Sequence, residues 1–189
     1  MAFPPAHMLV GAGIAEVVRV YEPLPRWRAW AGAAVLAVLP DADIVLGLAL
    51  GQGGSYHGTF THSLVAVATV GLVAWPLAGR RWGVLAAAAY ASHLVVDLLD
   101  DRGRTNVLLG WPFTETRPYA IARFFPTVPF EQGHGAMAAA RSLLEPEVFS
   151  RLLQQTALGA LCFGVLLLVA AALRAGRLSR PRAATPPSR

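Results

Sequence analysis

The sequence is short of the residues from which several common classes of site are built. It has one cysteine, Cys162, in 189 residues, so a single chain can form neither an internal disulfide nor a thiolate metal cluster. Its first residues, MAFPPAHM, contain no basic residue, so we expect no cleaved signal peptide. Charged residues make up only 14% of the chain, against about 25% in soluble domains. Hydrophobic residues make up 55%, and their arrangement must decide the class.

The apolar residues are gathered in runs long enough to form membrane helices. Five such runs occur, at residues 6–20, 29–50, 64–78, 82–99 and 156–173. The last has no charge at all and is long enough to cross a bilayer core. We therefore predict an all-α, polytopic membrane protein, with four to five membrane-embedded helices forming a single bundle domain over residues 1–173. The alternative, a soluble alanine-rich helical bundle, accommodates the 156–173 run poorly.

Basic residues predict how the chain lies across the membrane. The C-terminal segment 174–189 holds five arginines among proline, serine and threonine, so we predict a disordered tail on the cytoplasmic side. Arg80 and Arg81, in the turn between two apolar runs, fall on that same side. The region 101–155 then lies outside, as a loop or lid. Because the five tail arginines alone equal the net charge of +5, we expect the bilayer, and no specific nucleic acid, to be their partner.

Seven ionisable residues converge on the outer half of this predicted bundle, although they come from four segments. They are His7 in the first run, Asp41 and Asp43 in the second, His57 and His62 before the third, and His93 and Asp97 in the fourth. Ionisable side chains inside membrane helices are costly and usually face a bundle interior or an aqueous cavity. A shared cation offsets that cost, so we predict one metal centre formed by all seven.

Two short motifs carry much of this prediction. In SHLVVD, His93 and Asp97 lie four residues apart on one helical face, where both reach one ion or the aspartate orients the imidazole. A plain His–Asp pair between two helices is the alternative. In LPDAD, Pro40 breaks the helix. Asp41 and Asp43 can then serve one site if the proline distorts the backbone, or if one of them binds the metal and the other holds a metal-binding residue in place. The alternative is that one of them only caps a restarted helix.

The sequence HGTFTHS places two histidines in a turn between apolar runs. Gly58 allows the turn to fold His57 back toward His62. Thr61 is the expected cap of the following helix. The alternative is a pair of histidines at the membrane interface.

Histidine and aspartate ligands without cysteine suit zinc, manganese or iron. We expect zinc first, as one or two ions. A two-metal cluster of this kind activates a bridging water and steadies both oxygens of a phosphoryl displacement. Asp100 and Asp101, at a predicted helix end, are expected to be solvated.

The order of these motifs resembles that of the YdjM-like family of bacterial inner-membrane proteins, described as membrane-bound metal-dependent hydrolases. The resemblance covers about residues 7–115 and rests on an early histidine, LPDAD, HGTFTHS, HLVVD and GWPF. The family's second motif usually reads His-Arg-Gly-x-Thr-His-Ser, and this sequence lacks that arginine and the glycine after it. Arg102, Arg104 and Arg117 are outer-side candidates to hold a substrate anion instead.

The motif order is also similar to that of zinc-dependent phospholipases C, which are helical phosphodiesterases with a multi-zinc site. In those enzymes a further histidine and an HxxxE motif follow. Here His134 follows, but position 138, where an HxxxE motif starting at His134 would have its glutamate, is alanine, so that last motif is absent. The resemblance therefore implies phosphodiester chemistry without a complete three-zinc set.

These observations predict a metal-dependent hydrolase of the bacterial inner membrane, with its site toward the outer leaflet. The expected substrate is a phosphoester, lipid-linked or a small molecule, cleaved by a metal-activated water with Asp43 or Asp97 taking the proton. A divalent-metal transporter or sensor is the alternative, although the inner halves AWAGAAVLAVL and WGVLAAAAY hold almost nothing polar. The third hypothesis is a structural protein, in which the polar cluster only holds the helices together.

Overall fold

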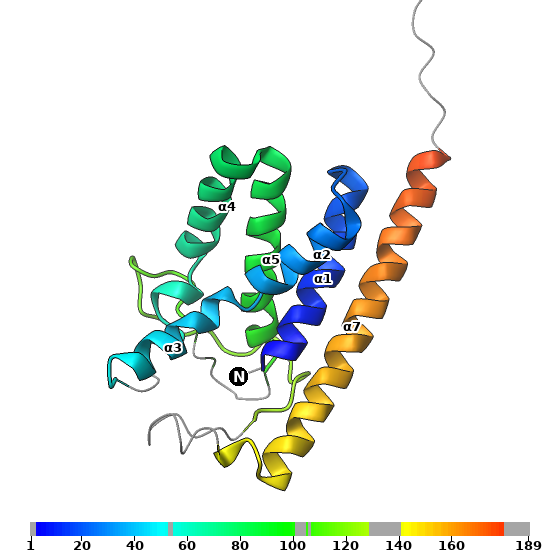
Figure 1. The fold of residues 1–189 in the computed structure, drawn as a ribbon. Helices are drawn as coiled ribbons and strands as arrows, with labels where there is room; N and C mark the ends of the chain where they lie inside the picture. The colour runs from blue at the N-terminus through cyan, green and yellow to red at the C-terminus, as the bar shows by residue number, and fades with distance from the viewer. Residues whose placement is uncertain (1–2, 53–54, 101–104, 106, 129–140, 180–189) are drawn as a thin grey trace, which may run out of the picture.

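A computed structural model describes residues 3–52, 55–100, 105, 107–128 and 141–179 (Figure 1). The elements are α1 (Pro4–Tyr21), α2 (Arg26–Leu36), the 3-10 turn η1 (Leu39–Asp41), α3 (Ala42–Ala49), the 3-10 turn η2 (Phe60–His62), α4 (Leu64–Ala78), α5 (Arg80–Leu98) and α7 (Pro146–Leu178). The described residues hold no β-strand, only an isolated bridge between Asp100 and Phe125. The predicted all-α class is confirmed.

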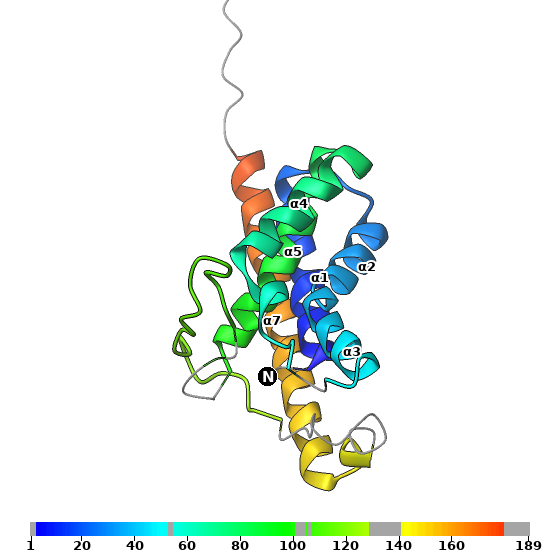
Figure 2. The same cartoon turned by 90° about the vertical axis from the view of Figure 1, so that its left-hand side faces the viewer.

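Helix α1 lies at the centre of the bundle. Helices α2, α5 and α7 pack against it, and α4 pairs with α5 (Figures 1 and 2). Glycine makes the close approach possible: a Cβ at Gly11 would lie 2.5 Å from the Cβ of Ala37, just after α2. A Cβ at Gly159 of α7 would lie 2.9 Å from the Cα of Ala6. Small residues therefore let both neighbours contact the N-terminal half of α1.

The second predicted run is broken at Pro40, as LPDAD predicts. Helix α2 ends at Leu36, the 3-10 turn η1 carries Pro40 and Asp41, and α3 begins at Ala42. No side-chain hydrogen bond caps α3, so the capping alternative finds no support. The broken backbone lets Asp41 and Asp43 both approach the turn that follows.

Helix α7 is longer than the predicted run at both ends. It has 33 residues, so residues 146–155, predicted as part of the lid, and residues 174–178, predicted as part of a disordered tail, are helical. The physical reason at the C-terminal end is docking onto α1: Arg174 donates to Glu16 at 2.5 Å, and Arg177 donates to the carbonyl of Val20. Residues 180–189 lie outside the described residues.

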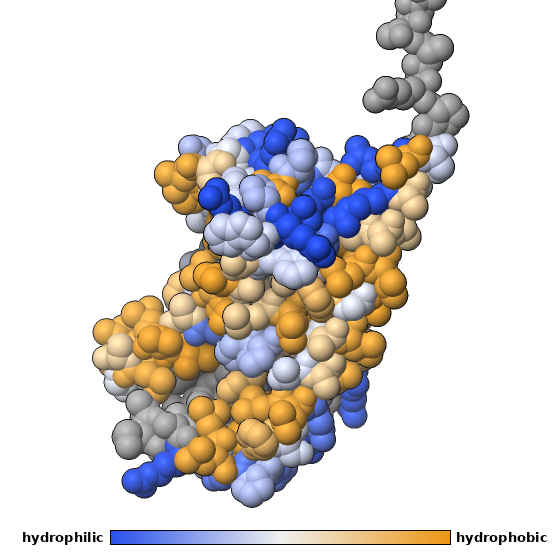
Figure 3. Space-filling view, turned by 45° about the vertical axis from the view of Figure 1, so that its right-hand side comes forward, coloured by the Kyte–Doolittle hydropathy of each residue, from blue (hydrophilic) through white to orange (hydrophobic). Residues whose placement is uncertain are grey.

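By length and composition, two helical stretches of the described chain are candidates to cross a membrane. They are Arg26–Ala49, which η1 interrupts, and α7. Helix α4 is apolar but has only 15 residues. These candidates number fewer than the four to five predicted membrane helices. Figure 3 shows hydrophobic residues over the middle of the face that α7 crosses and hydrophilic ones at its upper end, as on a membrane-embedded surface.

The described part of the predicted lid folds against the end of α5. Ile121 donates to the carbonyl of Leu98 at 2.8 Å, and Leu108 donates to the carbonyl of Gly58 at 3.0 Å. Asp100, predicted to be solvated, is 3% exposed and accepts a short hydrogen bond from Thr127. The prediction for Asp100 was wrong because this segment returns over the helix end. Asp101 lies outside the described residues.

Candidate metal centre

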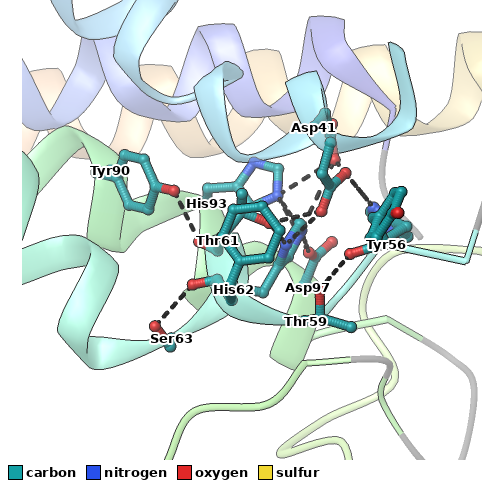
Figure 4. Close-up of polar contacts among 12 residues, drawn as sticks. Asp41, Tyr56, Thr59, Thr61, His62, Ser63, Tyr90, His93 and Asp97 are labelled. Carbon is teal, nitrogen blue, oxygen red and sulfur yellow. Dashed lines mark hydrogen bonds and ion pairs between the residues drawn. The ribbon is translucent and has the colours of Figure 1, made fainter. Parts of the chain in front are cut away.

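The seven predicted residues form one buried cluster at the end of the bundle where α1 begins and α5 ends. They are His7 of α1, Asp41 of η1, Asp43 of α3, His57 in the turn before η2, His62 of η2, and His93 and Asp97 of α5. Figure 4 labels four of them, Asp41, His62, His93 and Asp97, which lie close together. Each of the seven is at most 8% exposed. The convergence of four segments, inferred from the sequence, is present in the fold.

Helix α5 and the end of α2 together orient His93. Asp97 Oδ2 lies 3.2 Å from His93 Nε2, as the four-residue spacing predicts. On the other side of the ring, His93 Nδ1 lies 2.7 Å from the carbonyl oxygen of Ala37, the residue that follows the last residue of α2. A carbonyl can only accept, so Nδ1 donates, and Nε2 is the ring nitrogen that faces the cluster.

Asp43 orients the two histidines of the turn. His62 Nδ1 lies 3.3 Å from Asp43 Oδ2, and His57 Nδ1 lies 3.1 Å from Asp43 Oδ1. Thr61 donates to Asp43 Oδ2 at 2.5 Å, and Tyr90 donates to the Thr61 carbonyl at 2.7 Å. Burial lowers the pKa of His62 below its ordinary value. The lowered pKa favours the neutral form of His62, which is the form that binds metals, and because Nδ1 faces Asp43, Nε2 faces the cluster.

The distances from the Asp41 and Asp97 oxygens to the two central imidazole nitrogens are close to those between ligands of a tetrahedral ion. The Nε2 atoms of His62 and His93 are 3.1 Å apart. Asp97 Oδ2 lies 3.2 and 3.5 Å from the Nε2 atoms of His93 and His62, and Asp41 Oδ1 lies 3.5 and 3.8 Å from the same two atoms. Ligands bound tetrahedrally at about 2.0–2.1 Å are separated by about 3.3 Å. Two lone pairs at such a distance repel each other unless a proton or a cation lies between them.

The cluster is acidic and holds no guanidinium. No arginine among the described residues forms an ion pair with Asp41, Asp43 or Asp97, whose charged partners there are all histidines. Among the described residues, Asp41 Oδ2 and Asp97 Oδ1 also have no hydrogen-bond partner. Buried carboxylate oxygens without partners destabilise a fold. The donor set therefore fits a divalent cation.

The described residues offer three overlapping triads for a metal ion. They are His7, His93 and Asp97; Asp41, His62 and His93; and Asp43, His57 and His62. The first and third share no residue, so the cluster has donors for one ion or two. His7 stacks on His93 with ring centroids 3.8 Å apart, which ties α1 into the same centre.

The turn folds as predicted, but a different residue caps the helix after it. Gly58 has φ +80°, and the rings of His57 and His62 lie 4.7 Å apart. The cap of α4 is Ser63, whose hydroxyl accepts from the Ala66 amide at 3.1 Å, and not Thr61. The hydroxyl of Thr61 is already engaged with Asp43, which the sequence could not indicate.

Among the predicted anion-binding candidates, Arg117 is half-buried in the segment after α5. Arg102, Arg104 and His134 lie outside the described residues. The sequence did not predict that the Ala37 carbonyl accepts from His93 or that the Tyr90 hydroxyl donates to the Thr61 carbonyl. No local sequence pattern indicates which backbone carbonyl or distant hydroxyl will contact a given residue.

A second buried polar cluster, also missed, lies at the opposite end of α1. Glu16 is 1% exposed and accepts from Arg19 at 2.6 Å, Trp30 at 2.8 Å, Arg26 at 3.1 Å and Arg174 at 2.5 Å. A glutamate inside an apolar run with an arginine three residues later was the available signal. This cluster joins α1, α2 and α7.

Comparisons with known proteins agree with this architecture. Neither the curated proteins nor the solved structures contain a match to this chain. The family model described as YdjM inner membrane protein matches residues 1–178, which include every donor of the cluster. The chain therefore belongs to the family of YdjM inner membrane proteins.

Proposed function

We propose that this protein is a metal-dependent hydrolase that cleaves phosphoesters at the inner membrane. The observation that carries the proposal is the buried donor set, in which the Nε2 atoms of His62 and His93 lie 3.1 Å apart beside Asp41 and Asp97. Each of these two carboxylates also has one oxygen without a hydrogen-bond partner among the described residues. The metal would be held by Asp41, His62, His93 and Asp97, with His7 and His57 as further donors for a second ion. Zinc is the expected metal, and manganese or iron the alternatives.

The aspartates divide into two roles. Both oxygens of Asp43 are engaged, one with His57 and one with Thr61 and His62, so Asp43 orients ligands. Such outer partners fix the tautomer of the histidine that binds the metal. Asp41 and Asp97 each keep one oxygen without a hydrogen bond, so they are the better candidates to accept a proton, and of our two predicted acceptors we retain Asp97.

Hydrolysis adds water to phosphorus and breaks a P–O bond. One proton leaves the water, and one reaches the departing alkoxide. When bound, a divalent ion lowers the pKa of a coordinated water and polarises a phosphoryl oxygen. The chain supplies the carboxylate that takes and returns the proton, the carbonyl and carboxylate that hold the imidazoles, and a buried setting with little bulk water.

The packing between the two polar clusters favours a one-sided site over a transport path. The buried core there consists of small or apolar residues, namely Ala15, Leu24, Ala29, Ala33, Leu85 and Ala89. A carrier of divalent cations would need polar groups through this layer. If the cluster were purely structural, the buried carboxylates of Asp41, Asp43 and Asp97 would have only histidines as charged partners among the described residues.

We place the metal centre toward the outer leaflet and the end of α7 toward the cytoplasm. Arg19, Arg26, Arg80, Arg81 and Arg174 all gather at the end of the bundle away from the metal centre. Clustering of arginine on one side supports that orientation under the positive-inside rule.

Elemental analysis of the detergent-purified protein tests the proposal first. We expect about one or two equivalents of zinc, manganese or iron in the wild type, and none in the His93→Ala/Asp97→Ala double variant. Glu16→Gln is the matched control, because it alters a buried carboxylate at the other end and should keep its metal. A wild type that stays metal-free after reloading would refute the hydrolase, and cleavage of bis(p-nitrophenyl) phosphate by the loaded protein is the next assay.

A further inference from the structure

An apolar groove reaches the metal centre from the side of α3. It has a volume of about 390 Å³ and is lined by Phe3, Pro4, Val38, Asp41, Ala42, Ile44 and Val45. The volume falls in the range of about 300–1,000 Å³ found for small-molecule sites. The wall is hydrocarbon except at one residue, Asp41, which also belongs to the metal centre.

Asp41 connects the groove to the cluster. Its Oδ1 lies 3.5 Å from His93 Nε2, and its Oδ2 has no hydrogen-bond partner among the described residues. Asp41 is 8% exposed. A nine-tenths buried carboxylate with an unpaired oxygen, as the one polar residue in the lining of an apolar groove, indicates a ligand with a polar head and an apolar body.

The surroundings of the groove indicate where that ligand comes from. The groove lies on Arg26–Ala49, one of the two candidate membrane spans. Val45 at its rim is 68% exposed, and the nearby Leu46 and Leu39 are 45% and 43% exposed. Exposed aliphatic side chains on a membrane-spanning stretch face lipid tails, so the groove opens toward hydrocarbon and not toward bulk water.

We propose that the groove holds the hydrocarbon chain of a membrane lipid phosphoester, whose phosphate group lies at the metal centre. This inference rests on the proposed hydrolase function and narrows its substrate to a lipid. It also accounts for an acidic centre with no arginine partner: the anionic headgroup is held by the cation that balances Asp41 and Asp97.

The test uses Val45→Trp, which places an indole across the groove four residues from Asp41. Leu46→Trp is the matched control, since Leu46 is exposed on the same helix and does not line the groove. Each protein is purified with its metal content measured. It is then photolabelled with a phosphatidic acid that carries a diazirine in one acyl chain, and the labelled peptides are mapped by mass spectrometry.

We expect the label in Phe3–Pro4 and Val38–Val45, reduced about tenfold in Val45→Trp and unchanged in Leu46→Trp. A diacylglycerol with the same diazirine chain should label these peptides weakly, because it lacks the phosphate. Equal labelling by both lipids, or labelling that Val45→Trp leaves unchanged, would overturn the proposal.

Hydrolysis assays separate this inference from the proposed function. Leu46→Trp should cleave both bis(p-nitrophenyl) phosphate and phosphatidic acid like the wild type, whereas Val45→Trp should lose most turnover of phosphatidic acid. If the metal-loaded wild type cleaves neither ester and the groove is still labelled, the hydrolase fails and the lipid site stands. If both esters are cleaved equally by wild type and Val45→Trp, the hydrolase stands and the lipid groove is refuted.

Discussion

Replacing Gly11 with alanine should weaken the metal centre without altering any of its donors. The new Cβ would lie 2.5 Å from the Cβ of Ala37 and 2.7 Å from the carbonyl oxygen of Ala33. Carbon atoms pack at about 3.5–4.0 Å, so α1 and the end of α2 must separate by about 1 Å. Ala37 also accepts from His93 of α5 at 2.7 Å, and a shift of Ala37 away from α5 by the same amount would lengthen this contact to as much as about 3.7 Å, too far for a hydrogen bond.

Because the Ala37 carbonyl orients the His93 ring, losing this hydrogen bond should lower metal affinity by about 10- to 100-fold. Overpacking should also lower the free energy of unfolding by about 1–3 kcal/mol. Affinity is measured by competition with a zinc chelator in detergent, and stability by thermal unfolding. Gly164→Ala in α7 is the control, because a Cβ there meets nothing within 4 Å. Wild-type affinity and stability in Gly11→Ala would refute the idea that helix spacing holds His93.

Three further changes give separate tests. Glu16→Ala should lower the free energy of unfolding by about 3 kcal/mol, because it leaves Arg174 and its neighbours without their shared buried carboxylate. Thermal unfolding measures this change, and a loss of bound metal in the variant would contradict the separation of the two clusters. Thr61→Val removes the hydroxyl that donates to Asp43 at 2.5 Å, so chelator competition should reveal about tenfold weaker metal binding. Tyr90→Phe removes one hydrogen bond to the Thr61 carbonyl and should lower stability by about 1 kcal/mol in the same unfolding assay with wild-type metal content.

Much of the fold follows from the apolar pattern. The two apolar runs that form α4 and α5, the turn between them and the break at Pro40 were predicted because uninterrupted hydrophobic runs and a proline leave few other options. The boundaries of α7 were not, since its first ten residues mix charged and apolar side chains and its last five, RAGRL, include two arginines. Those last residues are held by Arg174 on Glu16, a contact between residues 158 positions apart that no local pattern reveals.

The convergence of the seven His and Asp residues on one buried cluster was predictable for a different reason. Ionisable residues in apolar runs are few, so each one found there indicates a shared interior. The division of roles within the centre was not predictable. Asp41 and Asp43 look alike in LPDAD, and only their distances to His57, His62 and His93 separate the ligand from the orienting carboxylate.

The packing of α7 on α1 has a consequence for how the chain is made. Phe3 donates to Gln155 at 2.6 Å, and Gly159 lies against Ala6, so the first described helix is completed by the last. While the ribosome synthesises the intervening residues, that face of α1 has no protein neighbour, and contacts of such long sequence separation form late. The helix that carries His7 therefore reaches its final setting only after nearly the whole chain has been translated.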